Sequence, residues 1–167
     1  MSLDATVGGS SSNSYVSQSE ATTYFSSRLY TSDWTGASSS TKDSALITAT
    51  QRIDQEFFEG TRVTSTQALK WPRLNVEIPN EHLTYSYPAY FSSTVIPQKV
   101  KDAVCEFALF LLATDALKPT GLENFKELTV GPIKLVMNQP VLAGRLPDQV
   151  LRLLRGLISS GTKMMRA

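Results

Sequence analysis

The chain has 167 residues, with 16 basic and 15 acidic side chains and a formal charge of +1. This length can bury a hydrophobic core without disulfides, and only 19% of the residues are charged, against roughly 25% in an average soluble domain. The composition excludes strongly electrostatic proteins such as histone-like DNA coats. One cysteine and one histidine exclude an intramolecular disulfide, a cysteine-based zinc cluster and two-histidine metal motifs. We therefore expect no enzymatic activity, no metal and no cofactor.

The sequence shows no pattern of a targeting or membrane segment. Residues 1–14 lack the basic cluster and apolar run of a secretory signal. The longest nearly apolar stretch, residues 103–113, is interrupted by Glu106 and is far shorter than the roughly 20 residues that a bilayer span needs. We expect a protein made in the cytoplasm that has no membrane partner.

The chain begins with a polar segment and a first helix. Residues 1–16 are rich in serine and glycine, which is typical of an arm, either a solvated terminus or an arm ordered by a neighbouring subunit. Ser17 and Glu20 have the spacing of a capping box, which predicts a helix start. The apolar stripe of this helix consists of Ala21, Tyr24, Phe25 and Leu29.

A second helix and a long irregular stretch follow. Helical spacing predicts a helix from Thr41 to about Phe58, ended by Gly60. Its stripe consists of Ala45, Leu46, Ala49, Thr50, Ile53 and Phe57. Residues 61–96 hold several prolines and a cluster of aromatic residues, so we predict a surface loop excursion there.

The second half of the chain predicts two more helices and one hairpin. A helix from Pro97 to about Leu117 is apolar nearly all round, so it should be the most buried helix. Residues 126–138 alternate as two short strands joined at Gly131-Pro132. A leucine-rich stripe from Leu146 to Leu157 predicts the last helix, ended by Gly156 or Gly161.

These elements predict a mainly α fold. It is a helical bundle of about four helices with one short β-hairpin and long loop and terminal arms. The expected division is an N-terminal arm over residues 1–16, a helical domain over 17–158 and a C-terminal tail over 159–167.

Few residues are candidates for catalysis. His82 lies in the proline-rich loop and no serine sits in a G-x-S-x-G elbow, so a surface histidine is favoured over a catalytic triad. Cys105 lies in the most apolar helix, which favours core packing over reactivity. Asp54, Glu56 and Glu59 surround one helix end without a second acidic cluster, which favours a solvated helix face over a metal site.

Nucleic-acid binding has two candidate regions. The cluster of Tyr85, Tyr87, Tyr90 and Phe91 could stack on bases, but no lysine or arginine occurs between Arg73 and Lys99. Residues 145–167 instead carry five basic residues and one acidic residue.

Two parts of this basic end are candidate partner-binding residues. Arg152 and Arg155, one helical turn apart, could face phosphate or an acidic partner, although a solvated helix face is the favoured interpretation. The tail is either a partner-binding segment, because methionines pack adaptably and cations steer, or a frayed terminus. Its distinctive residues are Lys163, Met164, Met165 and Arg166.

An ordered set of short motifs covers nearly the whole chain and resembles a phage family. The central motif runs from Gln67 to Arg73 and contains the sequence Trp-Pro-Arg. The family comprises phage neck proteins called "DnaT-like", related to the head–tail connector, or adaptor, proteins of tailed phages. The long insert after Arg73, through Tyr90, departs from it, and we carry no family role onto the insert. The other matching segments are Asn13–Ser17, Glu20-Ala21, Tyr24-Phe25, Ala45–Thr50, Ile53-Asp54, Phe57, Gly60, Arg62, Ile96-Pro97, Val100-Lys101, Ala103, Val130–Ile133 and Leu146-Pro147.

This resemblance implies a structural protein of the virion neck, assembled in the host cytoplasm. It implies a homo-oligomeric ring of about 12 subunits beneath the portal protein. The ring would pass double-stranded DNA without specific recognition and offer a docking surface to a downstream tail protein. The alternative is a single-stranded-DNA-binding, DnaT-like replication accessory protein.

The cationic, methionine-rich end of the chain supplies the residues that we expect to contact these partners. The expected contacts with portal and tail are Arg152, Arg155, Lys163, Met164, Met165 and Arg166. The motif Trp71, Pro72 and Arg73 is predicted to anchor the long loop onto its own helical bundle, an interpretation favoured over a partner-binding hot spot at Trp71.

Overall fold

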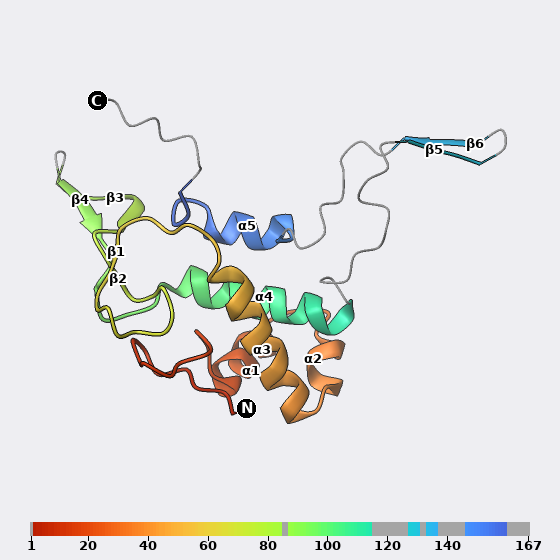
Figure 1. Ribbon diagram of the computed structural model, residues 1–167, viewed down its shortest axis with the longest axis horizontal. Coiled ribbons are helices and arrows are strands. Elements are labelled where there is room, and N and C mark those ends of the chain that lie inside the picture. The colour runs from red at the N-terminus through yellow and green to blue at the C-terminus, as the bar shows by residue number, and fades with distance from the viewer. Residues whose placement is uncertain (1, 85–86, 115–126, 131–132, 137–145, 160–167) are drawn as a thin grey trace.

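The computed structural model describes residues 2–84, 87–114, 127–130, 133–136 and 146–159. Figure 1 shows α4 running through the middle of the molecule, with α3 crossing it and α5 on its other side. The described residues form five helices, which are α1 (Gln18–Ser26), α2 (Ser32–Gly36), α3 (Ser39–Ile53), α4 (Gln98–Ala113) and α5 (Asp148–Leu154).

The strands form three separate antiparallel pairs in the described chain. Two pairs lie in the stretch between α3 and α4, and the third is the predicted hairpin before α5. The pairs are β1 (Thr61–Arg62) with β2 (Arg73–Leu74), β3 (Glu77–Thr84) with β4 (Tyr87–Tyr90), and β5 (Glu127–Val130) with β6 (Ile133–Val136). The predicted mainly α fold with a small β part is confirmed.

The core forms around α4, which contacts α1, α2, α3 and α5. Seven consecutive residues of α4, Ala103–Leu109, are buried, so the prediction that this helix is the most enclosed is confirmed. One of them, Glu106, is charged and accepts hydrogen bonds from Tyr24 Oη (2.8 Å), Arg28 Nη2 (2.7 Å) and Gln149 Nε2 (2.7 Å). The carboxylate therefore ties α4 to the segment around α1 and to the first turn of α5.

Local signals explain several helix boundaries. The Ser17–Glu20 capping box is present, with both reciprocal hydrogen bonds, and Ser38 caps α3 by accepting from the backbone N–H of Thr41. Pro97 occupies the N-cap position of α4. Beyond α5, Gly156 has a φ of +85°, a conformation that favours glycine, so the helix ends there as predicted; Gly161 lies outside the described residues.

Two predicted apolar stripes extend too far. The first helix ends at Ser26, and Leu29 beyond it is 76% exposed. The second ends at Ile53, so the predicted extension to Phe58 is wrong, and Phe57 is 80% exposed. The physical reason is that the side chain of Asp54, the first residue after the helix, makes tertiary hydrogen bonds. It accepts from Tyr15 Oη and from the Lys70 backbone N–H.

The structure adds elements that the sequence pattern did not reveal. Helix α2 is short, and it buries Trp34 against Phe25, with ring centroids 4.8 Å apart. The stretch 61–96, predicted as a surface excursion, contributes Trp71, Val76 and Ile96 to the core. The end of the expected arm is also packed, because Tyr15 and Val16 are each only 1% exposed.

The two predicted helices of the second half are present but shorter than predicted, because α4 ends at Ala113, where Thr114 is extended, and α5 spans only Asp148–Leu154. Residues 115–117, at the end of the predicted third helix, lie outside the described part of the chain, as do Gly131-Pro132 between β5 and β6. Within the described residues, no helix is long and apolar enough to cross a membrane.

Candidate functional site

The motif Trp71-Pro72-Arg73 lies between the strand pairs and the helical body. Trp71 is 1% exposed and packs edge-to-face against Phe58 and Phe91, with ring centroids 5.7 and 6.5 Å away. The peptide bond between Trp71 and Pro72 is cis. These contacts join the loop to the segment that follows α3.

Arg73 is a buried structural cation. Its guanidinium donates to the carbonyl oxygens of Glu59 (2.6 Å), Gly60 (2.6 Å) and Phe58 (3.2 Å). Burial lowers the pKa of Arg73, and these carbonyls satisfy its N–H groups. Because its guanidinium is hydrogen-bonded to the turn after α3, Arg73 has a structural role and does not face a partner.

The acidic residues after α3 have structural contacts. Asp54 accepts hydrogen bonds from Tyr15 Oη and from the Lys70 backbone N–H, the latter at 2.9 Å. Burial, followed by the nearby Asp54 charge, raises the pKa of Tyr15, so the phenol stays protonated as the donor. Among the described residues, no group of three or more metal-ligating side chains converges.

The remaining candidates for reactivity are a thiol and an imidazole. Cys105 is 2% exposed, and burial, followed by the charges of Asp102 and Glu106, raises its pKa to about 12. The predicted core role of Cys105 is therefore confirmed, because such a thiol is neither accessible nor ionised. The side chain of His82 lies outside the described residues.

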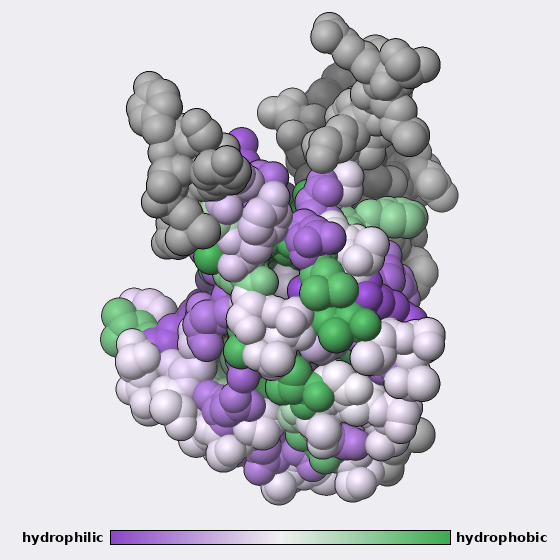
Figure 2. Space-filling view, turned by 90° about the vertical axis from the view of Figure 1, so that its left-hand side faces the viewer, coloured by the Kyte–Doolittle hydropathy of each residue, from purple (hydrophilic) through white to green (hydrophobic). Residues whose placement is uncertain are grey.

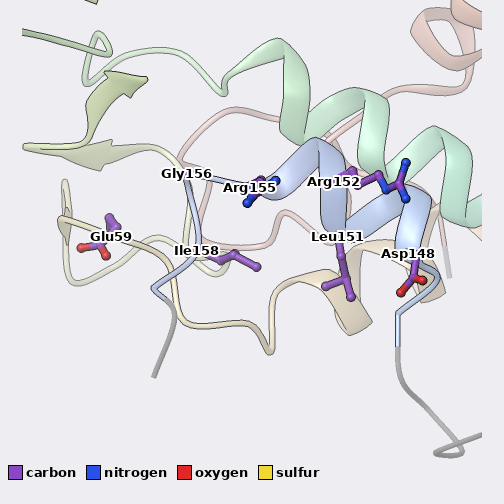
Figure 3. Close-up of a pocket in the computed structure, with 7 residues that line it drawn as sticks. All are labelled: Glu59, Asp148, Leu151, Arg152, Arg155, Gly156 and Ile158. Carbon is purple, nitrogen blue, oxygen red and sulfur yellow. The ribbon is translucent and has the colours of Figure 1, made fainter. Parts of the chain in front are cut away.

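A groove of about 790 Å³ runs along α5 (Figure 3). Arg152 and Arg155 line it, both exposed, and Figure 3 shows them projecting from α5 at separate points rather than converging. Leu151 and Ile158 supply apolar surface, so the groove combines two separated cations with hydrophobic side chains. Its other lining residues are Glu59, Asp148 and Gly156.

Backbone pairing brings the turn after α3 against the end of α5. Phe58 and Ile158 form an antiparallel bridge, and the Glu59 N–H donates to the Leu157 carbonyl oxygen at 2.9 Å. The Ser159 N–H donates to the Phe57 carbonyl oxygen at 2.6 Å. The groove is therefore built from two segments about a hundred residues apart, and both are fixed by main-chain hydrogen bonds.

An exposed aromatic side chain stands beside this groove. Phe57 is 80% exposed, and Lys70 Nζ lies 5.7 Å from its ring centroid. Lys70 Nζ also donates to the Glu56 carbonyl oxygen at 2.9 Å, which holds the ammonium group near the ring. Neither Phe57 nor Lys70 was a candidate from the sequence, where Phe57 was assigned to a buried stripe.

The other candidate residues are not brought to this groove by the described structure. Tyr90 is 50% exposed at the end of β4, and Phe91 packs against the core. Tyr85 and the side chain of Tyr87 lie outside the described residues, as do Lys163, Met164, Met165 and Arg166. By sequence, the chain that follows Ser159 carries two basic residues and no acidic residue.

The surface beside the strand pairs is neither uniformly hydrophobic nor uniformly hydrophilic. Figure 2 views the molecule from that side and shows hydrophobic residues exposed in the middle of the face, with hydrophilic residues in separate groups around them. Some of the cations in the described chain are already paired, Arg28 with Glu106 and Lys101 with Glu20. Arg152 and Arg155 are exposed cations that line the same groove.

Fold and groove define a small, mainly α-helical protein with a groove lined by arginines, acidic residues and apolar side chains. The chain belongs to the family described as "Putative DnaT-like ssDNA binding protein", whose model matches residues 1–167. No curated protein and no solved structure matches the chain. The DnaT-like part of the resemblance is confirmed, and the head–tail connector part stays a prediction.

Proposed function

We propose that this protein binds single-stranded DNA without sequence specificity, through the groove along α5. The observation that carries the proposal is the family match over the whole chain. The groove fits that chemistry, because single strands are held by cations that follow the phosphate backbone and by apolar or aromatic side chains that contact bases.

The residues have distinct roles in this proposal. Arg152 and Arg155 contact successive phosphates, since their side chains leave α5 at separate points (Figure 3). Leu151 and Ile158 pack against the faces of bases. Glu59 and Asp148 balance the two arginines within the groove itself, so we expect modest affinity, increased by the basic residues that follow Ser159 in the sequence.

The test is a titration of a fluorescein-labelled oligo(dT) by fluorescence anisotropy at low salt. We expect the double variant Arg152→Glu, Arg155→Glu to bind at least about tenfold more weakly than the wild-type chain, because four units of charge change beside the phosphates. The control is the double variant Arg62→Glu, Lys99→Glu, which also changes four units of charge, at two exposed cations outside the groove. Equal losses for the two variants would show a general charge effect and would refute the groove as the site.

A second candidate is the structural neck protein implied by the sequence resemblance, a ring beneath the portal that passes double-stranded DNA. The balance of acids and arginines in the groove favours it, because a channel wall should not hold DNA strongly. In this proposal Arg152, Arg155 and the residues Lys163–Arg166 contact the portal and tail proteins. Deleting residues 162–167 should then abolish co-sedimentation with portal rings, and unchanged co-sedimentation would count against it.

A further inference from the structure

A second apolar depression lies at the other end of α5 from the Phe57 turn. It has a volume of about 320 Å³ and is lined by the chain between α1 and α2, the last turns of α4 and the first turn of α5. Two aromatic rings line it, Tyr30, which is 90% exposed, and Phe110, which is 41% exposed. We call it the Tyr30–Phe110 pocket.

The charges of this pocket do not cancel. Arg28 and Glu106 both line it, and they pair with each other through the Arg28 Nη2–Glu106 Oε2 hydrogen bond of 2.7 Å. The remaining charged lining residue among those described is Asp33, which is exposed. The pocket is thus an apolar site with one net negative charge.

The same chain displays a side chain of matching character. Phe57 projects into solvent with Lys70 Nζ above its ring, so the pair is an apolar group with one positive charge. Its backbone is held in place by the hydrogen bond from Ser159 N–H to the Phe57 carbonyl oxygen. A projection that is already ordered loses little conformational entropy when it is buried.

We propose that Phe57 of one copy inserts into the Tyr30–Phe110 pocket of a second copy, with Lys70 facing Asp33. Burial of the ring between aromatic side chains supplies the attraction, and the opposite charges orient it. Phe57 does not line the pocket, and the two surfaces lie at opposite ends of α5, so each copy can use both surfaces at once. Such a contact is heterologous, and it extends head to tail into rings or rows of copies.

The contact is small, because one aromatic side chain buries much less than the roughly 1,200–2,000 Å² of a stable interface. Free copies should therefore associate weakly, in fast exchange, at concentrations well above the micromolar range. The proposal does not rest on DNA binding. Its test is made without DNA, so its failure would leave the proposed function standing.

Sedimentation velocity of the full chain, from about 10 µM to about 1 mM, tests self-association. The wild-type chain should show a sedimentation coefficient that rises with concentration. Phe57→Asp removes the inserted ring and Ala113→Arg fills the pocket mouth, so each variant should stay monomeric. Tyr90→Asp changes a half-exposed aromatic residue outside both surfaces and should behave as the wild type.

Mixing separates this contact from a symmetric one. An equimolar mixture of Phe57→Asp and Ala113→Arg retains one intact Phe57 and one intact pocket, so it should form heterodimers that do not grow further. Reversing both charges, with Asp33→Lys and Lys70→Glu in one chain, should restore the association that either change alone weakens. A wild type that stays monomeric, a Phe57→Asp variant that associates normally, or a mixture that stays monomeric would each overturn the proposal.

Discussion

The two ends of α5 differ in what they offer to a partner. At its first turn, Gln149 donates to the buried Glu106, and the surrounding pocket is apolar with aromatic walls. Past its last turn, main-chain bonds join residues 157–159 to residues 57–59, and exposed arginines line the groove. One short helix thus borders both an apolar pocket with aromatic walls and a groove in which two arginines lie beside two acidic residues.

The comparison shows that the hydrogen bonds that hold each end of α5 determine which side chains are exposed there. Side-chain hydrogen bonds to one carboxylate hold the first turn, whereas backbone pairing holds the region after the last turn and leaves Arg152 and Arg155 available. Changes to the two anchors should therefore have unequal effects on stability, and the following variants test that inequality.

The largest effect is expected for Glu106→Ala. The change removes the acceptor shared by Tyr24, Arg28 and Gln149, and leaves their donors without it in a partly buried site. We expect the free energy of unfolding to fall by about 2–3 kcal/mol, measured by urea denaturation. Glu20→Ala is the control, because it removes a more exposed carboxylate that pairs with Lys101 and accepts from the Ser17 backbone N–H, and it should cost about 1 kcal/mol or less. Equal losses of unfolding free energy in Glu106→Ala and Glu20→Ala would show that the buried carboxylate contributes no more than the exposed one.

A smaller effect is expected at the other end for Gly156→Ala. A Cβ on Gly156 would lie 2.9 Å from Pro79 Cγ, and the φ of +85° disfavours any side chain. We expect a loss of about 1–2 kcal/mol in the same denaturation experiment. The control is Gly36→Ala, where a Cβ would meet nothing within 4 Å, so the variant should be as stable as the wild type or slightly more so. A neutral Gly156→Ala would mean that α5 does not depend on this turn.

The smallest effect is expected for Glu20→Gln, which keeps the capping box but loses the charge. Burial by itself raises the pKa of Glu20, but hydrogen bonds from Lys101 and Ser17 outweigh it and lower the pKa overall. A depressed pKa stabilises the folded state above the unfolded pKa, and this contribution disappears as pH falls through the folded value. The wild type should thus exceed the variant in stability by a few tenths of a kcal/mol at pH 7 and match it once the pH has fallen below the folded pKa of Glu20. A difference that persists at the lower pH would assign it to geometry rather than charge.

The sequence predicts the interior of this protein well. Apolar side chains at helical spacing identify α1, α3, α4 and α5, and the Ser17–Glu20 pair identifies one start, because burial and capping depend on local spacing. The same spacing misplaces Phe57, since periodicity cannot show that the Asp54 side chain, at the end of the helix, accepts hydrogen bonds from Tyr15 and Lys70, residues distant in the chain. Short elements such as α2, which packs on α4, and the strand pair β1–β2 depend on contacts between separate segments as well.

The candidate site is predictable only in part. Arg152 and Arg155 follow from the helical pattern, because they lie opposite the leucine stripe. The segment after α3 that forms the other side of the groove cannot be predicted in this way. It reaches the groove only because the fold pairs Phe58 with Ile158. The Tyr30–Phe110 pocket likewise joins three separate segments. A surface made from several segments leaves no local pattern in any one of them.

The salt dependence of oligo(dT) affinity tests the central claim, that α5 holds single-stranded DNA through two arginines. The logarithm of the association constant should fall linearly with the logarithm of salt concentration, and each phosphate contact to a single strand contributes a slope of about −0.7. The variant Arg152→Ala, Arg155→Ala should therefore show a slope less steep than the wild type by about 1.4. The account would be contradicted by a wild-type affinity that does not change with salt concentration, or by a variant with the same slope as the wild type.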